Sequence, residues 1–274
     1  MIVSGGEILI KKRLGLCQRW VRYMKVTCLL FAFQKKKCNT TIVSIFLNPT
    51  QFSENEDLDS YPNTINQDLI KLQDENVDAV FMPSANEMYQ NNQQDYWFDS
   101  PLSLKLEGRS RPLFFKGVTM IVHKLFKIIQ PTHTVFGKKD AQQLLIIKQM
   151  IKKNNYGIKM IAGPTVRSKD GLALSSRNTY LNIKETKIAH NVYLGLLKIK
   201  QGLGSGEKNP EILKNTFIEH IGLFDELSID YISIACDKSL DEIVGLINQS
   251  VLISTAVFLN KVRLVDNFSY SPSM

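Results

Sequence analysis

The stretch THTVFGKKDAQQLLIIKQMIKKNN, residues 132–155, carries the pattern that decides the fold. Its first six residues are β-branched and apolar enough for a buried strand, and this run ends at Gly137. From Lys139 onward, apolar side chains recur at helical spacing, which predicts a helix over residues 139–155. A strand that leads directly into a helix is the repeating unit of an α/β protein.

The same alternation extends to both sides of this stretch. Further strands are predicted at TIVSIFLN (41–48), DAVFMP (78–83) and IKMIAGP (158–164). Helices are predicted at NTINQDLIKLQDENV (63–77), opened by Asn63, and at GVTMIVHKLFKIIQ (117–130). Strand, helix and strand in this order imply right-handed crossovers, so we expect a mainly parallel sheet.

The pattern changes after SSRNTYL (175–181). Two helices, roughly Glu185–Gln201 and Pro210–Leu223, are predicted, with GLGSGEKN (202–209) as a flexible connector between them. Three β-rich runs follow: IDYISIA (229–235), VLISTAVFL (251–259) and VRLVDN (262–267). We therefore expect a parallel α/β domain of residues 1–178 and a smaller α+β domain of residues 179–274.

The segment GLCQRWVRYMKVTC (15–28) differs from its surroundings in charge and cysteine content. Nine Lys and Arg residues and no Asp or Glu lie between Lys11 and Cys38, so the rest of this +8 chain carries a net charge of −1. Three of the four cysteines also lie there, but no Cys-x-x-Cys pair occurs, which disfavours a disulfide framework or a zinc site.

These features suggest a reducing, cytoplasmic location. Glu7 and the scarcity of Ser argue against an organelle-targeting peptide, which the acid-poor N-terminal region would otherwise allow. No apolar run approaches the roughly 20 residues needed to span a bilayer, so no membrane association is expected.

Three loops that follow predicted strands carry residues suited to binding. In FGKKD (136–140), Gly137 lets the backbone approach a ligand, the helix start offers N–H groups to a phosphate, and Lys139 adds a charge. In DGLALSSRN (170–178), two hydroxyl groups precede Arg177. The third loop is NPTQF (48–52). Taken singly, the three are also compatible with a solvated helix start, an ordinary cap and a turn.

Taken together and in this order, the loops give the chain from about Thr41 to its end a close resemblance to the pantothenate synthetases, which are ATP-dependent pantoate–β-alanine ligases. The matching text is VSIFLNPTQFSENEDLDSYPNT, DAVFMPSANEMY, LEGRSRP, FKGVTMIVHKLFKIIQPTHTVFGKKDAQQL, PTVRSKDGLALSSRNTYL and VRLVDN. The resemblance implies a Rossmann-like nucleotide-binding domain of the nucleotidylyltransferase or class I synthetase type, followed by a C-terminal lid domain.

The resemblance also implies a reaction in two steps and a set of site residues. Pantoate carboxylate attacks the α-phosphorus of ATP and releases pyrophosphate; the β-alanine amine then takes the acyl group from pantoyl adenylate and releases AMP. Gln51 and Gln143 would bind pantoate and β-alanine, and Lys139 and Arg177 would be catalytic. The ATP-binding residues would be Gly137, Lys138, Lys139, Asp140, Val166, Leu174, Ser175, Ser176 and Arg177.

The further implications concern metal and partners. Mg²⁺ would accompany ATP, without a set of metal ligands in the protein, and the chain would form a homodimer. Neither nucleic acid nor a membrane is expected as a partner. The chain departs from the family pattern at Lys138, where an acidic or other residue is common, and at Leu113 and Phe114, which replace a Gly-His pair.

The largest departure is at the N-terminus. The family carries a segment like IGFVPTMGALHEGHLSLI, whose two histidines bind ATP phosphates and whose second histidine is the expected proton donor. The four histidines of this chain are His123, His133, His190 and His220, and all of them follow the first matching strand.

The genetic code offers an explanation for residues 14–31, LGLCQRWVRYMKVTCLLF. Codons for this peptide, shifted back by one nucleotide, can encode IGFVPTMGALHEGHLSLI in full. Two residues of the shifted segment are forced: Trp20 before Val21 requires Gly, and Met24 before Lys25 requires Glu. KKR (11–13) and KKK (35–37) bracket the segment, and their adenine-rich codons are prone to gain or lose a base.

We therefore hypothesise two compensating frameshifts, which are either sequencing errors or a real lesion. If the shifts are artefacts, the protein is an active ligase. If they are real, it is a catalytically inactive relative that keeps the fold and partial substrate binding. Nucleic-acid binding through the basic segment is a third hypothesis, which we rank last. Because the family's first buried strand becomes one that contains Gln18, Arg19 and Arg22, we expect Met1–Cys38 to be partly displaced or poorly packed.

Overall fold

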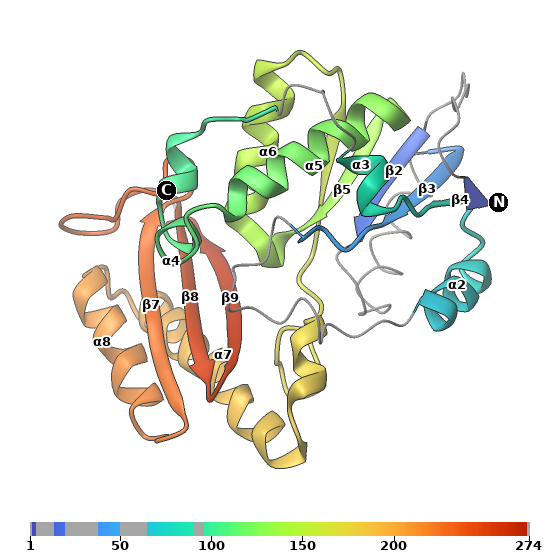
Figure 1. Cartoon of the computed structure of the whole chain (residues 1–274). Coiled ribbons are helices and arrows are strands. Elements are labelled where there is room, and N and C mark those ends of the chain that lie inside the picture. The colour runs from blue at the N-terminus through green and yellow to red at the C-terminus, as the bar shows by residue number, and fades with distance from the viewer. Residues whose placement is uncertain (1, 4–13, 20–37, 50–64, 90–95, 273–274) are drawn as a thin grey trace. The chain divides into compact units, whose positions relative to one another are not determined.

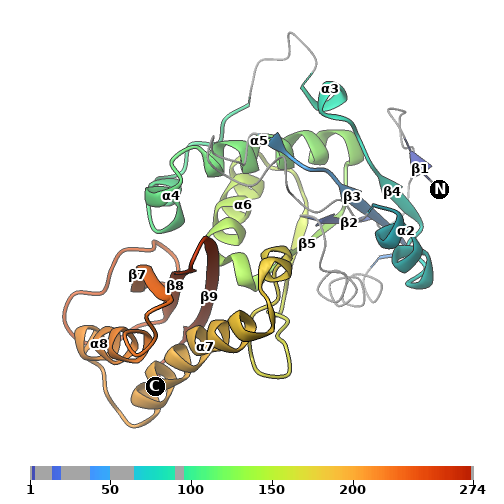
Figure 2. The same cartoon turned by 60° about the horizontal axis from the view of Figure 1, so that its bottom comes forward.

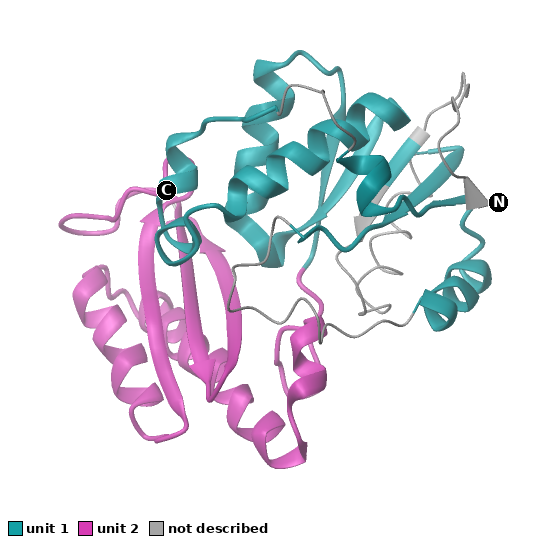
Figure 3. Ribbon diagram, in the orientation of Figure 1, with its two compact units in different colours: residues 1–164 teal, residues 165–274 magenta. Residues whose placement is uncertain are grey.

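The computed structural model describes residues 2–3, 14–19, 38–49, 65–89 and 96–272 (Figure 1). The chain forms two compact units, Met1–Pro164 and Thr165–Met274 (Figure 3). The domain boundary expected near residue 178 stays a prediction; the loop of residues 165–178 lies within the second unit. In the described part of the chain, no helix has the length and apolar character to cross a membrane.

The first unit contains a six-stranded sheet in which every pairing is parallel. The spatial order is β1-β4-β3-β2-β5-β6. The strands are β1 (Ile2–Val3), β2 (Leu14–Arg19), β3 (Thr40–Ile45), β4 (Ala79–Phe81), β5 (His133–Gly137) and β6 (Lys159–Gly163). This confirms the predicted parallel sheet.

Helices lie on both faces of this sheet (Figure 2). Alternate residues of β3 point to opposite faces, and Val43 and Ile45 join Leu72 of helix α2 (Ile65–Asp74) in one core cluster. Ile42 and Phe46 are buried on the other face. The helices of this unit are α2 (Ile65–Asp74), α3 (Ala85–Met88), α4 (Glu107–Ser110), α5 (Phe114–Ile129) and α6 (Ala141–Lys153), with 3₁₀ turns η2 (Pro101–Leu104) and η3 (Lys138–Asp140). Asn63, the predicted start of α2, lies outside the described residues.

Strand β2 limits the expectation that Met1–Cys38 is partly displaced or poorly packed. It pairs with β3 from Leu14 to Arg19 and with β5 on its other side, so it occupies the centre of the sheet. Leu16 is 1% exposed, and its carbonyl oxygen accepts a hydrogen bond from Thr134 Oγ1. The backbone of these six residues is therefore not displaced, since the small and apolar start of the strand, Leu-Gly-Leu, fits a central position. For the rest of Met1–Cys38 the expectation stays a prediction.

The second unit contains an antiparallel sheet of three strands, β7 (Leu227–Cys236), β8 (Val251–Leu259) and β9 (Val262–Tyr270), in that order. Helices α7 (Ile183–Gly204) and α8 (Pro210–Ile221) pack on one face of it (Figure 2). This confirms the predicted α+β character. A 3₁₀ turn, η4 (Ser176–Tyr180), precedes α7.

The connector predicted at residues 202–209 is wrong in its first part, because α7 continues through Gly204. A Cβ atom on Gly202 would come within 2.9 Å of Leu213 Cδ2, so glycine there allows α8 to approach closely. Asn209 then caps α8, with its side chain accepting a hydrogen bond from Glu211 N at 3.0 Å. Glycine at this site serves helix packing rather than flexibility.

A cluster of aromatic and polar groups joins α5 to the end of α6. His123 Nδ1 is hydrogen-bonded to Tyr156 Oη, and the His123 ring stacks on Tyr96 with ring centres 3.8 Å apart. Burial lowers the pKa of His123, and the nearby Lys127 and Lys124 lower it further. Burial, with Tyr96 as a further cause, raises the pKa of Tyr156 to about 12.

The depressed pKa of His123 predicts that stability falls in mildly acidic solution. Below the ordinary histidine pKa of 6.5, the unfolded chain takes up a proton that the folded chain resists, so the free energy of unfolding decreases as the pH falls through this window. Urea denaturation between pH 5 and 7.5 should show a shallower pH dependence for His123→Gln than for the unmodified chain. Equal slopes for the two proteins would refute this role of His123.

Candidate active site

The strand order places a topological switch point at the centre of the parallel sheet. From β2 the chain proceeds to β3 and β4 on one side, whereas β5 and β6 lie on the other side. Ligands of parallel α/β sheets bind at the carboxyl ends of the strands that flank such a switch point. Here these ends are Arg19 of β2 and Gly137 of β5. Residues 20–37, which follow β2, lie outside the described residues.

The loop after β5 holds four of the predicted ATP-binding residues together. Gly137 ends the strand, Lys138–Asp140 form the turn η3, and α6 starts at Ala141. The side chain of Lys139 is 19% exposed, and its Nζ lies 3.8 Å from Asp140 Oδ1. The start of a 13-residue helix offers backbone N–H groups to which an anion can bind, and Lys139 adds positive charge beside them.

Gly137 has ordinary extended backbone angles, with φ −77° and ψ 138°, so its glycine identity is not a conformational requirement. Among the described residues, the nearest atom to a Cβ built there is Lys139 N, at 4.0 Å. The described part of the chain therefore leaves space beside this glycine.

We predict that Gly137→Ala keeps or slightly raises stability, by up to about 1 kcal/mol, because alanine restricts the unfolded chain. ATP affinity should instead fall about tenfold, since the added methyl group occupies the space where a ligand meets the backbone. Thermal unfolding and calorimetric titration with ATP measure the two effects separately. A destabilised protein with unchanged ATP affinity would contradict this prediction.

Two adjacent glutamines follow Ala141 in the first turn of α6, and their surroundings differ. Gln143, a predicted pantoate- and β-alanine-binding residue, is 7% exposed near the helix start. Gln142 is 5% exposed and holds the preceding loop: its Nε2 donates to the carbonyl oxygens of Leu102 and Lys105 at 2.7 Å each, and its Oε1 accepts from Glu107 N at 3.1 Å.

The loop held by Gln142 contains an unusual backbone conformation. Leu106 has φ 44° and ψ −116°, which a non-glycine residue rarely adopts. A Cβ on Gly108 would lie 1.8 Å from Ser103 O, so only glycine fits there. A strained turn of this kind persists because its surroundings determine it, and Gln142 supplies three of the hydrogen bonds that do so.

The third predicted loop is described only at its start. Gln51 lies outside the described residues. Asn48 is 1% exposed; its Nδ2 donates to Gly117 O at 3.2 Å, and its Oδ1 accepts from Tyr89 Oη. These hydrogen bonds of Asn48 therefore fix the position at which the loop after β3 begins.

The residues that replace the family's Gly-His pair have ordinary surroundings. Leu113 is 68% exposed ahead of α5, and the guanidinium carbon of Arg111 lies 4.0 Å from the centre of the Phe114 ring. Phe114 also contacts Phe115 edge to face, with ring centres 5.0 Å apart. The Phe114 ring therefore makes a cation–π contact with Arg111 and an edge-to-face contact with Phe115.

The remaining predicted ATP-binding residues lie together in the second unit. Leu174 N donates to Val166 O at 2.9 Å, so these two residues face each other across a tight hairpin. Ser175 follows directly and caps η4: its Oγ accepts from Arg177 N at 3.3 Å, and its N donates to Asn178 Oδ1 at 2.5 Å. Ser176 and Arg177 begin that turn, where both side chains are partly exposed.

Metal binding depends on the donor set that the protein offers. The described residues contain no group of three or more His, Cys, Asp and Glu side chains that could hold a metal ion. Mg²⁺ usually retains several waters and binds through substrate phosphates with one or two carboxylates. Asp140, half exposed beside Lys139, is a carboxylate suited to such a phosphate-borne ion.

Comparisons with known proteins identify the family. The model of the family described as pantoate-beta-alanine ligase matches residues 28–269. The pantothenate synthetase of Thermosipho africanus is 46% identical over 233 residues, which span 85% of this chain and 83% of that protein. The chain belongs to the pantoate–β-alanine ligase family. The match begins at Cys28, which leaves most of the segment GLCQRWVRYMKVTC outside it.

Solved structures of pantoate–β-alanine ligases share the fold. The pantothenate synthetase of Thermus thermophilus superposes with a TM-score of 0.92 at 30% identity, over 96% of this chain and 95% of that one. A pantoate–β-alanine ligase from Francisella tularensis, crystallised with β,γ-ATP and β-alanine, superposes with a TM-score of 0.77 at 32% identity, over 95% and 91% of the two chains. The Rossmann-like, nucleotidylyltransferase-type fold with a smaller α+β part is thereby confirmed.

Three residues of this ligase were missed in the sequence as candidates for a role near the site. Gln142 is hydrogen-bonded to the loop that contains Leu106 and Gly108. Arg167 and Asp266 join the hairpin of Val166 and Leu174 to β9. All three stand inside the stretches that carry the family resemblance. The partners of Gln142 lie 35 to 40 positions away in the sequence, and Arg167 and Asp266 are 99 positions apart. Local sequence patterns do not predict contacts at such separations.

Proposed function

We propose that this protein catalyses the ATP-dependent condensation of pantoate with β-alanine to pantothenate, through a pantoyl-adenylate intermediate. One observation carries the proposal: a chain of the pantoate–β-alanine ligase family places its Gly-Lys-Lys-Asp loop at the switch point of a parallel sheet. ATP and β-alanine are bound in the Francisella tularensis relative.

In the first step, the pantoate carboxylate attacks the α-phosphorus of ATP, and pyrophosphate leaves. Negative charge grows on the phosphate oxygens, and Lys139 and Arg177 supply positive potential there, together with the hydroxyl groups of Ser175 and Ser176. Gln143 and Gln51 orient pantoate for in-line attack. Mg²⁺ carried by the phosphates would neutralise further charge.

In the second step, the β-alanine amine attacks the acyl carbon of pantoyl adenylate, and AMP leaves. No nucleophile from the protein takes part, because both attacking groups belong to substrates. The contribution of the protein is therefore positioning and electrostatic stabilisation, and ATP-binding groups also retain the departing AMP.

Full activity requires the N-terminal segment in its shifted frame. Two observations support this part of the proposal: the family match begins at Cys28, and β2 with its short apolar start occupies the central position beside the switch point. In that frame, two histidines would follow β2 at the edge of the sheet where ligands bind. The protein would act in the cytoplasm as a homodimer.

The test is exchange of labelled pyrophosphate into ATP by the chain carrying IGFVPTMGALHEGHLSLI at residues 14–31. Reversible adenylation predicts exchange that requires pantoate and proceeds without β-alanine. Exchange that depends on β-alanine, or none in the presence of pantoate and ATP, would exclude the adenylate route. An inactive relative would bind substrates without exchange.

A further inference from the structure

We propose that the Arg167–Asp266 ion pair is a positioning device that holds the hairpin of residues 166–174 in the conformation that binds ATP. The inference rests on the proposed function, and it gives a role to the VRLVDN stretch, which the reaction itself leaves unused. Arg167 and Asp266 are positioning residues, because neither is among the residues assigned to ATP.

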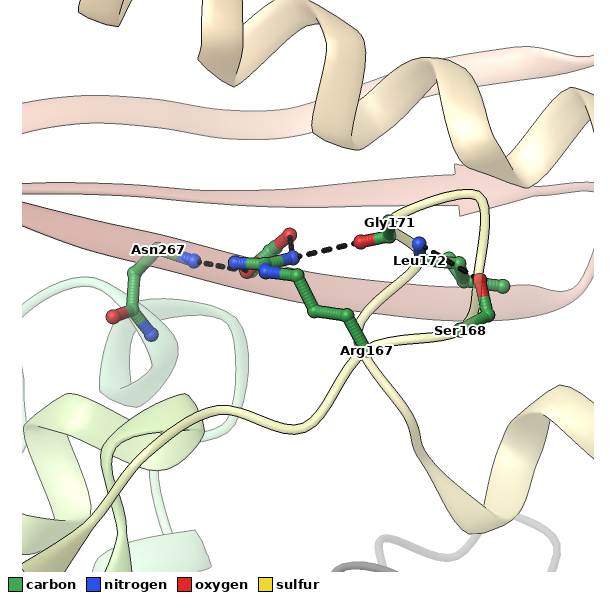
Figure 4. A network of polar contacts seen from close by, with 6 residues as sticks. Arg167, Ser168, Gly171, Leu172 and Asn267 are labelled. Atoms are coloured by element: carbon green, nitrogen blue, oxygen red, sulfur yellow. Dashed lines mark hydrogen bonds and ion pairs between the residues drawn. The ribbon is translucent and has the colours of Figure 1, made fainter.

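The pair is a two-point contact between the hairpin and β9. Arg167 Nη1 lies 2.5 Å from Asp266 Oδ2, and Arg167 Nη2 lies 2.8 Å from Asp266 Oδ1. Figure 4 shows the guanidinium of Arg167 reaching from its loop toward the strand that carries Asn267. Such a planar fork fixes direction as well as distance, which a single contact does not.

The same guanidinium also fixes the hairpin internally. Arg167 Nη1 donates to Gly171 O at 3.0 Å, and the guanidinium carbon lies 4.3 Å from the centre of the Tyr193 ring on α7. Asp266 is 3% exposed, and its Oδ1 accepts a further hydrogen bond from Asn267 N at 2.7 Å. The buried carboxylate of Asp266 therefore orients the Arg167 side chain, which in turn binds the carbonyl oxygen of Gly171 in the same hairpin.

The hairpin leaves little freedom for another arrangement. Ser168 N donates to Leu172 O at 2.9 Å, and Leu172 N donates to Ser168 Oγ at 3.1 Å (Figure 4). Gly171 has φ +93°, and a Cβ there would lie 2.1 Å from the Tyr193 ring. The ladder continues to Val166 and Leu174, so an anchor at Arg167 sets the position of both.

Loss of the carboxylate charge should loosen this arrangement. Asparagine at position 266 keeps the side-chain volume but can accept through one oxygen only, so the guanidinium loses one of its two contacts and its charge partner. The backbone of Val166 and Leu174 then samples more conformations, and ATP binding must select the competent one, which lowers apparent affinity.

A matched control exists in the same unit. Arg263 of β9 contacts Asp230 of β7, with Arg263 Nη2 at 2.5 Å and Nε at 3.1 Å from Asp230 Oδ2. This is also an Arg–Asp pair between segments distant in sequence, but it joins two strands rather than the hairpin. Asp230→Asn therefore removes a comparable ion pair without touching residues 166–174.

The experiment is calorimetric titration with Mg²⁺-ATP and, separately, with pantoate, of the full chain carrying IGFVPTMGALHEGHLSLI at residues 14–31 and of its variants. Asp266→Asn is expected to raise the Kd for ATP about ten- to a hundredfold and to leave the Kd for pantoate within about twofold. Arg167→Lys, which keeps the charge but loses the fork, should weaken ATP binding to an intermediate extent. Asp230→Asn should leave both constants within about twofold of the chain without this substitution.

A general loss of structure would move both ligands alike, so the pantoate titration and thermal unfolding separate it from positioning. Unchanged ATP affinity in both Asp266→Asn and Arg167→Lys would overturn the inference while leaving the proposed function intact. Absence of ATP binding by the chain that carries IGFVPTMGALHEGHLSLI at residues 14–31 would contradict the proposed function and the inference with it. Arg167→Lys keeps the test decisive should Asp266→Asn fail to fold.

Discussion

Replacement of residues 14–31 by IGFVPTMGALHEGHLSLI is expected to raise the rate of pantothenate formation at least about a thousandfold over the chain as written. The loss of one donor that stabilises charge in the transition state typically costs about a hundred- to a thousandfold in rate, and the shifted segment returns two histidines at once. Effects of groups that act together are not additive, so the gain need not reach the product of two such factors.

The measurement is a coupled assay of AMP release with pantoate, ATP and β-alanine, run on both chains at equal concentration. The control variant carries IGFVPTMGALAEGALSLI, which restores the strand and the glycine-rich approach but not the histidines. It should unfold at the same temperature as the restored chain and remain nearly inactive. Comparable activity of the chain as written would disprove the account of residues 14–31, as would a gene in which no one-base shift yields the segment.

Lys139→Met in the restored chain is expected to lower kcat/KM for ATP about a hundred- to a thousandfold. The Lys139 side chain is only 19% exposed, at the end of β5 and beside the start of α6, where it would act on the charge that develops during transfer. Methionine keeps most of the length of the side chain and removes the ammonium group, so the loss reports the charge rather than the volume.

Lys148→Met is the matched control for this change, because Lys148 is an exposed lysine on α6 and its loss alters the net charge equally. Its kcat/KM should stay within about twofold of the restored chain, since an isolated surface charge contributes little. A drop of similar size in both variants would show that overall charge, rather than the position of Lys139, governs the reaction.

Periodicity in the sequence was sufficient to predict most of the elements that position this site. Short β-branched runs and helical spacing are local properties, so β3, β5 and α6 could be predicted from neighbouring residues alone. The loop Gly137–Asp140 is found at the end of β5 as expected, because the strand and the helix that border it are both strongly patterned.

Other features depend on partners that are distant in the chain, and local reasoning missed them. The polar end of β2, Gln18 and Arg19, suggested a displaced segment, yet pairing with β3 and β5 keeps its backbone at the centre of the sheet. The glycines at positions 202 and 204 suggested a flexible connector, yet α8 packs close to the helix that contains them. The contact between Arg167 and Asp266 joins residues 99 positions apart.

The product stoichiometry of the restored chain tests the proposed function most directly. After incubation with pantoate, β-alanine and Mg²⁺-ATP, nucleotides and pantothenate are separated and quantified. The proposed mechanism predicts one AMP and one pyrophosphate for each pantothenate, with no ADP. Formation of ADP and phosphate in step with pantothenate, or absence of pantothenate, would contradict it.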